Sequence, residues 1–170
     1  IKEYAVAHPD VPRILCSGWR QPTTGGLALA SMIDDLDPRP IFISADDLHS
    51  AWCSTAALKE LGVQDMPDPS SGTIHRDENG TPTGLLSENA AFRIVWPFLA
   101  QVATEEQNVA AIQTAIQSYL ALGCAGVVDM AMDVDTWEVL QRFRSQEKFP
   151  MWIAAYWLIT PKESTAENIV

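Results

Sequence analysis

A short run of polar and aromatic residues, placed directly after an apolar stretch, is the part of this sequence best suited to chemistry. Residues 41–45 read Ile-Phe-Ile-Ser-Ala, and Asp46, Asp47, His49 and Trp52 follow them closely. An imidazole among carboxylates can donate or accept a hydrogen bond near neutral pH. His49 is therefore the leading catalytic candidate, and Trp52 could supply the wall of a pocket. The plainer alternatives are that His49 caps the following helix and that Trp52 belongs to the core.

Asp129 is the second catalytic candidate. It stands near the end of residues 125–131, an apolar run that we expect to form a buried strand. Barrel enzymes keep their chemistry at the carboxyl ends of their strands. A role as a buried cap of the backbone is equally open for this carboxylate.

The first hundred residues predict a small mixed domain. Asn79-Gly80 is a strong hairpin signal, and Ser54 and Gly62 are a typical start and stop for a short helix. Ser87 is expected to cap a second helix that has Glu88 in its first turn and stops before Pro97. We expect strands at 13–17, 41–45, 73–77 and 83–86, and helices at 27–36, 55–61 and 87–96.

The remaining residues have a different pattern, because helices and strands alternate with short joints. Thr104-Glu-Glu-Gln107 is a capping-box sequence, which predicts a helix that begins there and ends at Gly123. A strand at 125–131, a helix at 135–146 and a strand at 151–159 follow. This order is typical of parallel βα units. It places a domain boundary near residue 100.

Several motifs give the chain a family resemblance. The pair Gly18-Trp19 comes first, followed by His49-Ser-Ala-Trp-Cys-Ser-Thr-Ala-Ala-Leu58 and then by Arg76-Asp-Glu-Asn-Gly-Thr-Pro-Thr-Gly-Leu-Leu-Ser-Glu88. In this order they resemble the central segment of the YtcJ-like amidohydrolases (amidohydrolase family 3), which are related to N-substituted formamide deformylase. The chain departs from the family pattern at Cys53 and Ser54, where an aliphatic residue and Asn are usual. The residues that match the family's structural motif are Arg76, Asp77, Gly80, Pro82, Gly84 and Glu88.

The resemblance implies a fold and an activity. The fold is α/β: a fragment of a metal-dependent-hydrolase TIM barrel that carries a small α+β insertion domain. Residues 1–11 would end a preceding helix, 12–99 would form the insertion, and 100–170 would form a partial barrel segment. The parent would hydrolyse a non-peptide carbon–nitrogen bond of an amide or formamide with a divalent metal, expected to be zinc. The residues that would face its small-molecule substrate are Trp19, Asp46, His49 and Trp52.

The histidine count argues against metal ligands in this chain. The family's metal site needs paired histidines, whereas the sequence has only His8, His49 and His75, at wide spacing. Metal sites of this kind need several converging N and O ligands. We therefore expect a fragment whose metal ligands lie elsewhere in a longer parent, and an isolated chain that binds no metal and is inactive.

Composition excludes some partners and leaves two other functions open. A net charge of −11 argues against nucleic acid, because no basic patch could neutralise phosphates. No run of about 20 apolar residues is present, so we expect no membrane span and a cytoplasmic location. Unpaired barrel strands favour self-association or contact with the remaining barrel segments. The alternatives to the enzyme are a non-catalytic module that binds a small molecule or protein, and a purely structural insertion.

Overall fold

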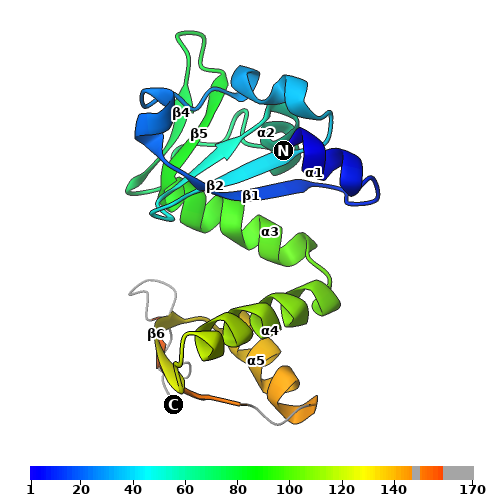
Figure 1. The fold of residues 1–170 in the computed structure, drawn as a ribbon. Coiled ribbons are helices and arrows are strands. Elements are labelled where there is room, and N and C mark those ends of the chain that lie inside the picture. The colour runs from blue at the N-terminus through cyan, green and yellow to red at the C-terminus, as the bar shows by residue number, and fades with distance from the viewer. Residues whose placement is uncertain (147–149, 159–170) are drawn as a thin grey trace. The chain divides into compact units, whose positions relative to one another are not determined.

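The computed structural model describes residues 1–146 and 150–158, which divide into two compact units, 1–101 and 102 onward. The first unit is built on a five-stranded sheet with strand order β1-β2-β3-β5-β4 (Figure 1). Only β1 and β2 are parallel, and every other neighbouring pair is antiparallel. The strands are β1 (Ile14–Trp19), β2 (Ile41–Ala45), β3 (Ser50–Cys53), β4 (Gly72–Arg76) and β5 (Pro82–Glu88).

Helices and short turns cover both faces of this sheet. The helices are α1 (Lys2–Ala7), α2 (Thr55–Leu61) and α3 (Trp96–Val102), with 3-10 turns η1 (Gln21–Thr24), η2 (Ala30–Met32) and η3 (Asp34–Leu36) and a π turn, η4 (Ala91–Val95). Because side chains alternate along a strand, Phe42 and Ile43 belong to different cores. Phe42 packs with residues of α2 and η4, and Ile43 packs with residues of α1 and the 28–33 segment.

Helix α2 and the hairpin confirm what the sequence predicts. The Ser54 hydroxyl accepts a hydrogen bond from the Ala57 N–H, and Gly62 ends α2 in the left-handed conformation. In the β4–β5 hairpin, the Asp77 carboxylate accepts bonds from the N–H groups of Asn79 and Thr81. Both elements depend on contacts between residues close in sequence, which is why the pattern predicts them well.

Three predictions for this unit differ from the structure. Residues 27–36 form the 3-10 turns η2 and η3 rather than one α-helix. The sequence analysis expects a helix directly after His49, but the Asp46–His49 segment is a hairpin turn that leads into the buried strand β3. The helix predicted at 87–96 is present but begins at residue 89, and Ser87 does not cap it, since β5 continues through Glu88.

Pro97 does not end the helix that follows β5. The N–H of Trp96 bonds to the carbonyl of Ala91, five residues earlier, in the widened turn η4. A π turn inserts an extra residue into a helix, and here it comes directly before the proline. The helix therefore continues through Pro97 to Val102.

Arg39 ties the first helix to the sheet. Its guanidinium donates to the carbonyls of Ala5, His8 and Val11 and to the Asp37 carboxylate. Ala5 is buried in the same cluster as β1 and β2. Residues 1–11 therefore pack as part of the first unit.

The Asp37–Arg39 pair should make stability depend on acidity. Hydrogen bonds from Arg39 lower the pKa of Asp37 to about 2. A carboxyl whose pKa is lower in the folded than in the unfolded state stabilises the fold above its unfolded pKa, and loses that contribution as pH falls through its folded pKa. We expect the urea midpoint of Asp37→Asn to lie below that of the native chain at neutral pH. The gap should narrow between about pH 4 and pH 2; a gap that stays constant would contradict the pairing.

The second unit contains two parallel strands joined by a helix, with a further helix before them. These elements are α4 (Glu105–Ala121), β6 (Gly126–Met132), α5 (Val134–Gln146) and β7 (Trp152–Trp157). The capping box at Thr104 and Gln107 forms as the sequence predicts. Ile116, Phe143 and Met151 form a small core. The last residue of the predicted strand 151–159 lies outside the described residues.

Candidate functional site

The order of the strands brings most of the candidate residues of the first unit to one edge of the sheet. Strands β1, β2 and β5 end at this edge, and β3 and β4 begin there. Trp19 ends β1, Asp46 follows β2, His49 precedes β3, and Glu88 ends β5. Residues distant in sequence thus become neighbours at what we call the Trp19–Glu88 edge.

His49 and Glu88 form an ion pair at this edge. The His49 Nδ1 lies 3.0 Å from the Glu88 Oε2, and each side chain is 57% exposed. The Glu88 N–H also donates to the His49 carbonyl at 2.8 Å. The hydrogen bond to Glu88 and then its negative charge raise the pKa of His49, and Asp47 adds a smaller contribution. The pair therefore favours the protonated imidazole.

A hollow of about 890 Å³ lies at the same edge, at the ends of β1 and β2, and Asp46 and Asp47 of the β2–β3 turn line it. Its apolar part includes Trp19 and Pro22, and its polar part includes Arg20 and Asp46. Arg20 Nε donates to Asp46 Oδ2 at 2.8 Å, and both side chains are well exposed. An opening with one apolar wall and a few polar groups is the usual form of a small-molecule site.

Sequence reasoning missed two residues at this edge, Arg20 and Phe92. Arg20 follows Trp19 at the end of β1, so its position beside Asp46 follows from the parallel pairing of β1 and β2. The strand-end position of Arg20 was the available signal. Phe92 lies on η4 and contacts the His49 ring edge-on at a centroid distance of 5.6 Å. The two residues are far apart in sequence, so no local pattern predicts that contact.

Trp52 lies in the core rather than at the hollow. It is 6% exposed, its Nε1 donates to the Leu29 carbonyl at 2.9 Å, and its ring contacts that of Trp19 at 5.3 Å. This placement fits the core role that the sequence left open. We leave Trp52 out of the proposed substrate contacts.

Asp129 belongs to the second unit and lies inside β6, three residues before its end at Met132. Its Oδ1 accepts a hydrogen bond from the Ala131 N–H at 2.9 Å, where the pairing of β6 with β7 becomes irregular. The half-buried carboxylate is therefore engaged with the backbone of its own strand, and its catalytic role stays a prediction.

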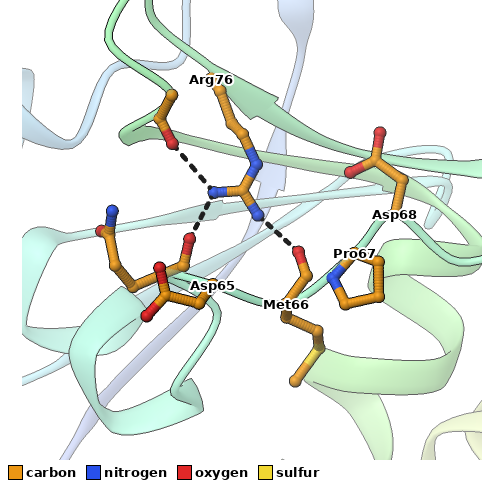
Figure 2. Close-up of a pocket in the computed structure, with 7 residues that line it drawn as sticks. Asp65, Met66, Pro67, Asp68 and Arg76 are labelled. Atoms are coloured by element: carbon orange, nitrogen blue, oxygen red, sulfur yellow. Dashed lines mark hydrogen bonds between the residues drawn. The ribbon is translucent and has the colours of Figure 1, made fainter.

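Arg76 lies at the other end of the strands, where β4 ends and β5 begins. Its side chain there bonds to backbone carbonyls. Figure 2 shows its guanidinium among the residues that line a hollow of about 540 Å³. The two terminal nitrogens donate to the carbonyls of Val63, Gln64, Met66 and Gly80. This arrangement fits the structural role that the sequence suggests for Arg76.

The described residues do not suit a catalytic metal. Among residues 1–146 and 150–158, no three His, Cys, Asp or Glu side chains converge in a way that could hold a metal ion. His49 and Glu88 offer one nitrogen and one carboxylate, already bonded to each other. We therefore derive no step through a metal from this chain. In the same residues no helix has the length and hydropathy needed to cross a bilayer.

With this geometry in place, comparison with known proteins identifies the class. The model of the amidohydrolase family matches residues 1–169, so the chain belongs to that family. This confirms the family that the motifs from His49 to Glu88 indicate.

Three curated relatives extend the comparison. The exoenzymes regulatory protein AepA of Pectobacterium carotovorum subsp. carotovorum is 28% identical over 99% of this chain and 38% of its own length. The N-substituted formamide deformylase of Arthrobacter pascens is 30% identical over 69% of this chain and 22% of its own. The putative amidohydrolase YtcJ of Bacillus subtilis (strain 168) is 36% identical over 48% of this chain and 16% of its own. The chain thus spans well under half the length of each.

A solved structure supports the fold. An uncharacterized metal-dependent hydrolase from Pyrococcus horikoshii OT3 superposes with a TM-score of 0.64 and 22% identity over 87% of this chain and 28% of that one. The mixed α/β fold of this chain therefore resembles part of a metal-dependent hydrolase.

Proposed function

We propose that this chain is part of a metal-dependent amidohydrolase that cleaves a non-peptide carbon–nitrogen bond of the amide or formamide type. Membership of the amidohydrolase family carries the proposal. The name of the Arthrobacter pascens relative points to an N-substituted formamide as the substrate class.

In this proposal the first unit, a small insertion domain, supplies one wall of the substrate site. The supporting observation is that Trp19, Asp46 and His49 share one edge of the sheet, where Trp19 and Asp46 line the hollow. Trp19 is 8% exposed and packs in the same core as Trp52, but unlike Trp52 it lines the hollow, where it and Pro22 offer apolar surface to the organic part of the substrate. Arg20, Asp46 and His49 offer hydrogen-bonding groups to its polar part.

The second unit would form part of the barrel wall. It has the parallel βαβ order of such a barrel. Val128, Met130, Trp152 and Tyr156 are each more than half exposed on its two strands. We propose that further barrel segments cover these side chains, and that the metal ligands, with zinc the expected ion, lie in those segments.

Hydrolysis by the longer protein tests the proposal. We expect it to convert formanilide to formate and aniline, or acetanilide to acetate and aniline, both followed as aniline release. Activity should disappear when 1,10-phenanthroline removes the metal and return with zinc, because the metal supplies the activated water. The 170-residue chain alone should release no aniline.

Two outcomes would contradict the proposal. Full activity in metal-stripped protein would exclude the metal dependence. Failure to hydrolyse the anilides and N-methylformamide, with zinc present in stoichiometric amount, would exclude the carbon–nitrogen specificity. In the second case, saturable binding of the intact anilides would favour the non-catalytic binding module, for which the hollow beside Trp19 would serve equally well.

A further inference from the structure

We infer that Glu88 is a positioning residue that holds the imidazole of His49 in place, so that its second nitrogen, Nε2, donates a hydrogen bond to an oxygen of the bound substrate. The inference rests on the proposed function and adds to it a residue, Glu88, that the family motif marks only as structural. Four observations on the Trp19–Glu88 edge carry it.

The contact between the two side chains leaves one nitrogen of His49 available. Glu88 Oε2 accepts from Nδ1 at 3.0 Å, and within the described part of the chain no protein group bonds to Nε2. More than half of the imidazole is exposed. A carboxylate on one imidazole nitrogen fixes which nitrogen faces a ligand, as in catalytic triads.

The backbone on both sides of the pair is strained. Leu48 has a φ of 64° and Glu88 a φ of 54°, a region that residues with a Cβ seldom adopt. Such a residue costs about 1–2 kcal/mol, whereas an exposed ion pair contributes about 0–1 kcal/mol. The ion pair therefore contributes less free energy than the strained backbone costs. Glycine, which adopts this backbone conformation without strain, would give a fold at least as stable. A functional need for the carboxylate explains why Glu stands there.

The third observation is that Phe92 limits the orientation of the ring. Its ring meets that of His49 at an interplanar angle of 81°. Phe92 belongs to η4, and π turns are frequent at functional sites. The imidazole is thus held from two directions, by Glu88 at the end of β5 and by Phe92 on the following helix.

The fourth observation concerns charge. Glu88 on β5 and Asp47 on the β2–β3 turn are the acidic groups that act on the imidazole. Asp47 Oδ1 accepts from the His49 backbone N–H, which leaves the ring to Glu88. Both carboxylates raise the pKa of His49 and favour the form in which Nε2 carries a proton. A protonated nitrogen recognises an acceptor oxygen, such as the carbonyl of an amide.

The first experiment measures the His49 pKa in this 170-residue chain by NMR titration of the imidazole. Glu88→Gln and Glu88→Asn should both lower the pKa of His49 toward its ordinary value, because both remove the carboxylate. Asn adopts the left-handed region more readily than most residues, so Glu88→Asn should be at least as stable as the native chain. An unchanged His49 pKa in both variants would overturn the inference.

The second experiment measures kcat/KM against pH in the longer protein, with formanilide as substrate. Protonated His49 is the active form, so kcat/KM should fall as pH rises through the His49 pKa. In Glu88→Gln this fall should begin at lower pH, because the pKa is lower. His49→Ala should reduce kcat/KM about 10-fold to 1,000-fold below the native pKa and remove this limb. The control Glu138→Gln removes an equally exposed paired carboxylate and should leave the profile unchanged.

The outcomes separate the two ideas. Hydrolysis with an unchanged high-pH limb in Glu88→Gln would overturn the positioning role while the proposed function stands. Absence of hydrolysis in every form, including the native protein, would overturn the proposed function itself. A loss of thermal stability in Glu88→Gln that is matched by no change in the pH profile would mean that Glu88 is structural.

Discussion

Replacing Gly84 with alanine is expected to destabilise the first unit by about 3 kcal/mol or more. Gly84 lies in β5 with a φ of 131°, where residues with a Cβ are strained. A Cβ there would lie 2.5 Å from the backbone nitrogen of Ala30 and 2.7 Å from the carbonyl oxygen of Ala28. Backbone atoms cannot move aside as a flexible side chain can. The segment 28–30 would have to move away from the sheet and expose Ala28, which packs in the core that includes Ile43.

Gly80→Ala is the matched control for this prediction. Gly80 also has a positive φ, 79°, but a Cβ there would meet no atom within 4 Å. We expect a loss of only about 1 kcal/mol, from backbone conformation alone. Urea unfolding followed through the amide NMR signals of β3 and β5 measures both variants in the same unit. Equal losses would show that the close approach of the 28–30 segment contributes nothing.

The sequence predicts the elements that depend on contacts between residues close in sequence, and it misses those that depend on contacts between distant residues. The β4–β5 hairpin is predictable because its turn residues, such as Asp77 and Gly80, bond within a few residues of each other. Strand β3 is only four residues long and is surrounded by residues that suit a turn or helix. Its register is set by β2 and β5, with Trp52 opposite both Ile43 and Leu85. Such long-range pairing has no local signal.

The wrong start of the helix predicted at 87–96 has a similar cause, since the chain becomes helical only from residue 89. Ser87 followed by Glu88 looks like the first turn of a helix, where Ser caps and Glu favours the dipole. In the structure Ser87 pairs with Ser50 of β3 and with Thr73 of β4, so β5 runs on to Glu88. Sheet pairing on both sides of a strand overrides a weak capping preference.

The candidate site was only partly predictable. Trp19, Asp46 and His49 each stand beside a strand end, and this local signal indicates polar or aromatic groups at an edge. Which strand ends lie next to one another depends on the strand order, in which β5 lies between β3 and β4. The pairing of His49 with Glu88, 39 residues later, follows from that order alone. Sequence reasoning could therefore propose His49 but could not name its partner.

Replacing Arg76 with alanine should lower the free energy of unfolding of the first unit by about 3 kcal/mol. Its guanidinium donates to Gln64 and Met66 at 2.7 and 2.6 Å, and to Val63 and Gly80 at 3.1 Å. These bonds join the loop after α2 to the β4–β5 hairpin (Figure 2). Val63, beside them, is fully buried in the first core. Without the arginine, the partly buried carbonyls lose a charged donor, and the loop is free to leave the hairpin.

Arg76→Lys and Arg20→Ala separate geometry from charge in this last prediction. Lysine keeps the charge but has one compact ammonium group, which cannot reach carbonyls on both sides as a planar fork does. We expect it to recover less than half of the loss. Within residues 1–146 and 150–158 the Arg20 side chain bonds only to Asp46, in an exposed ion pair, so Arg20→Ala should cost about 1 kcal/mol or less. Urea unfolding with hydrogen exchange at residues 63–66 provides the measurement. Full recovery in Arg76→Lys would mean that a positive charge, rather than the guanidinium fork, holds the loop to the hairpin.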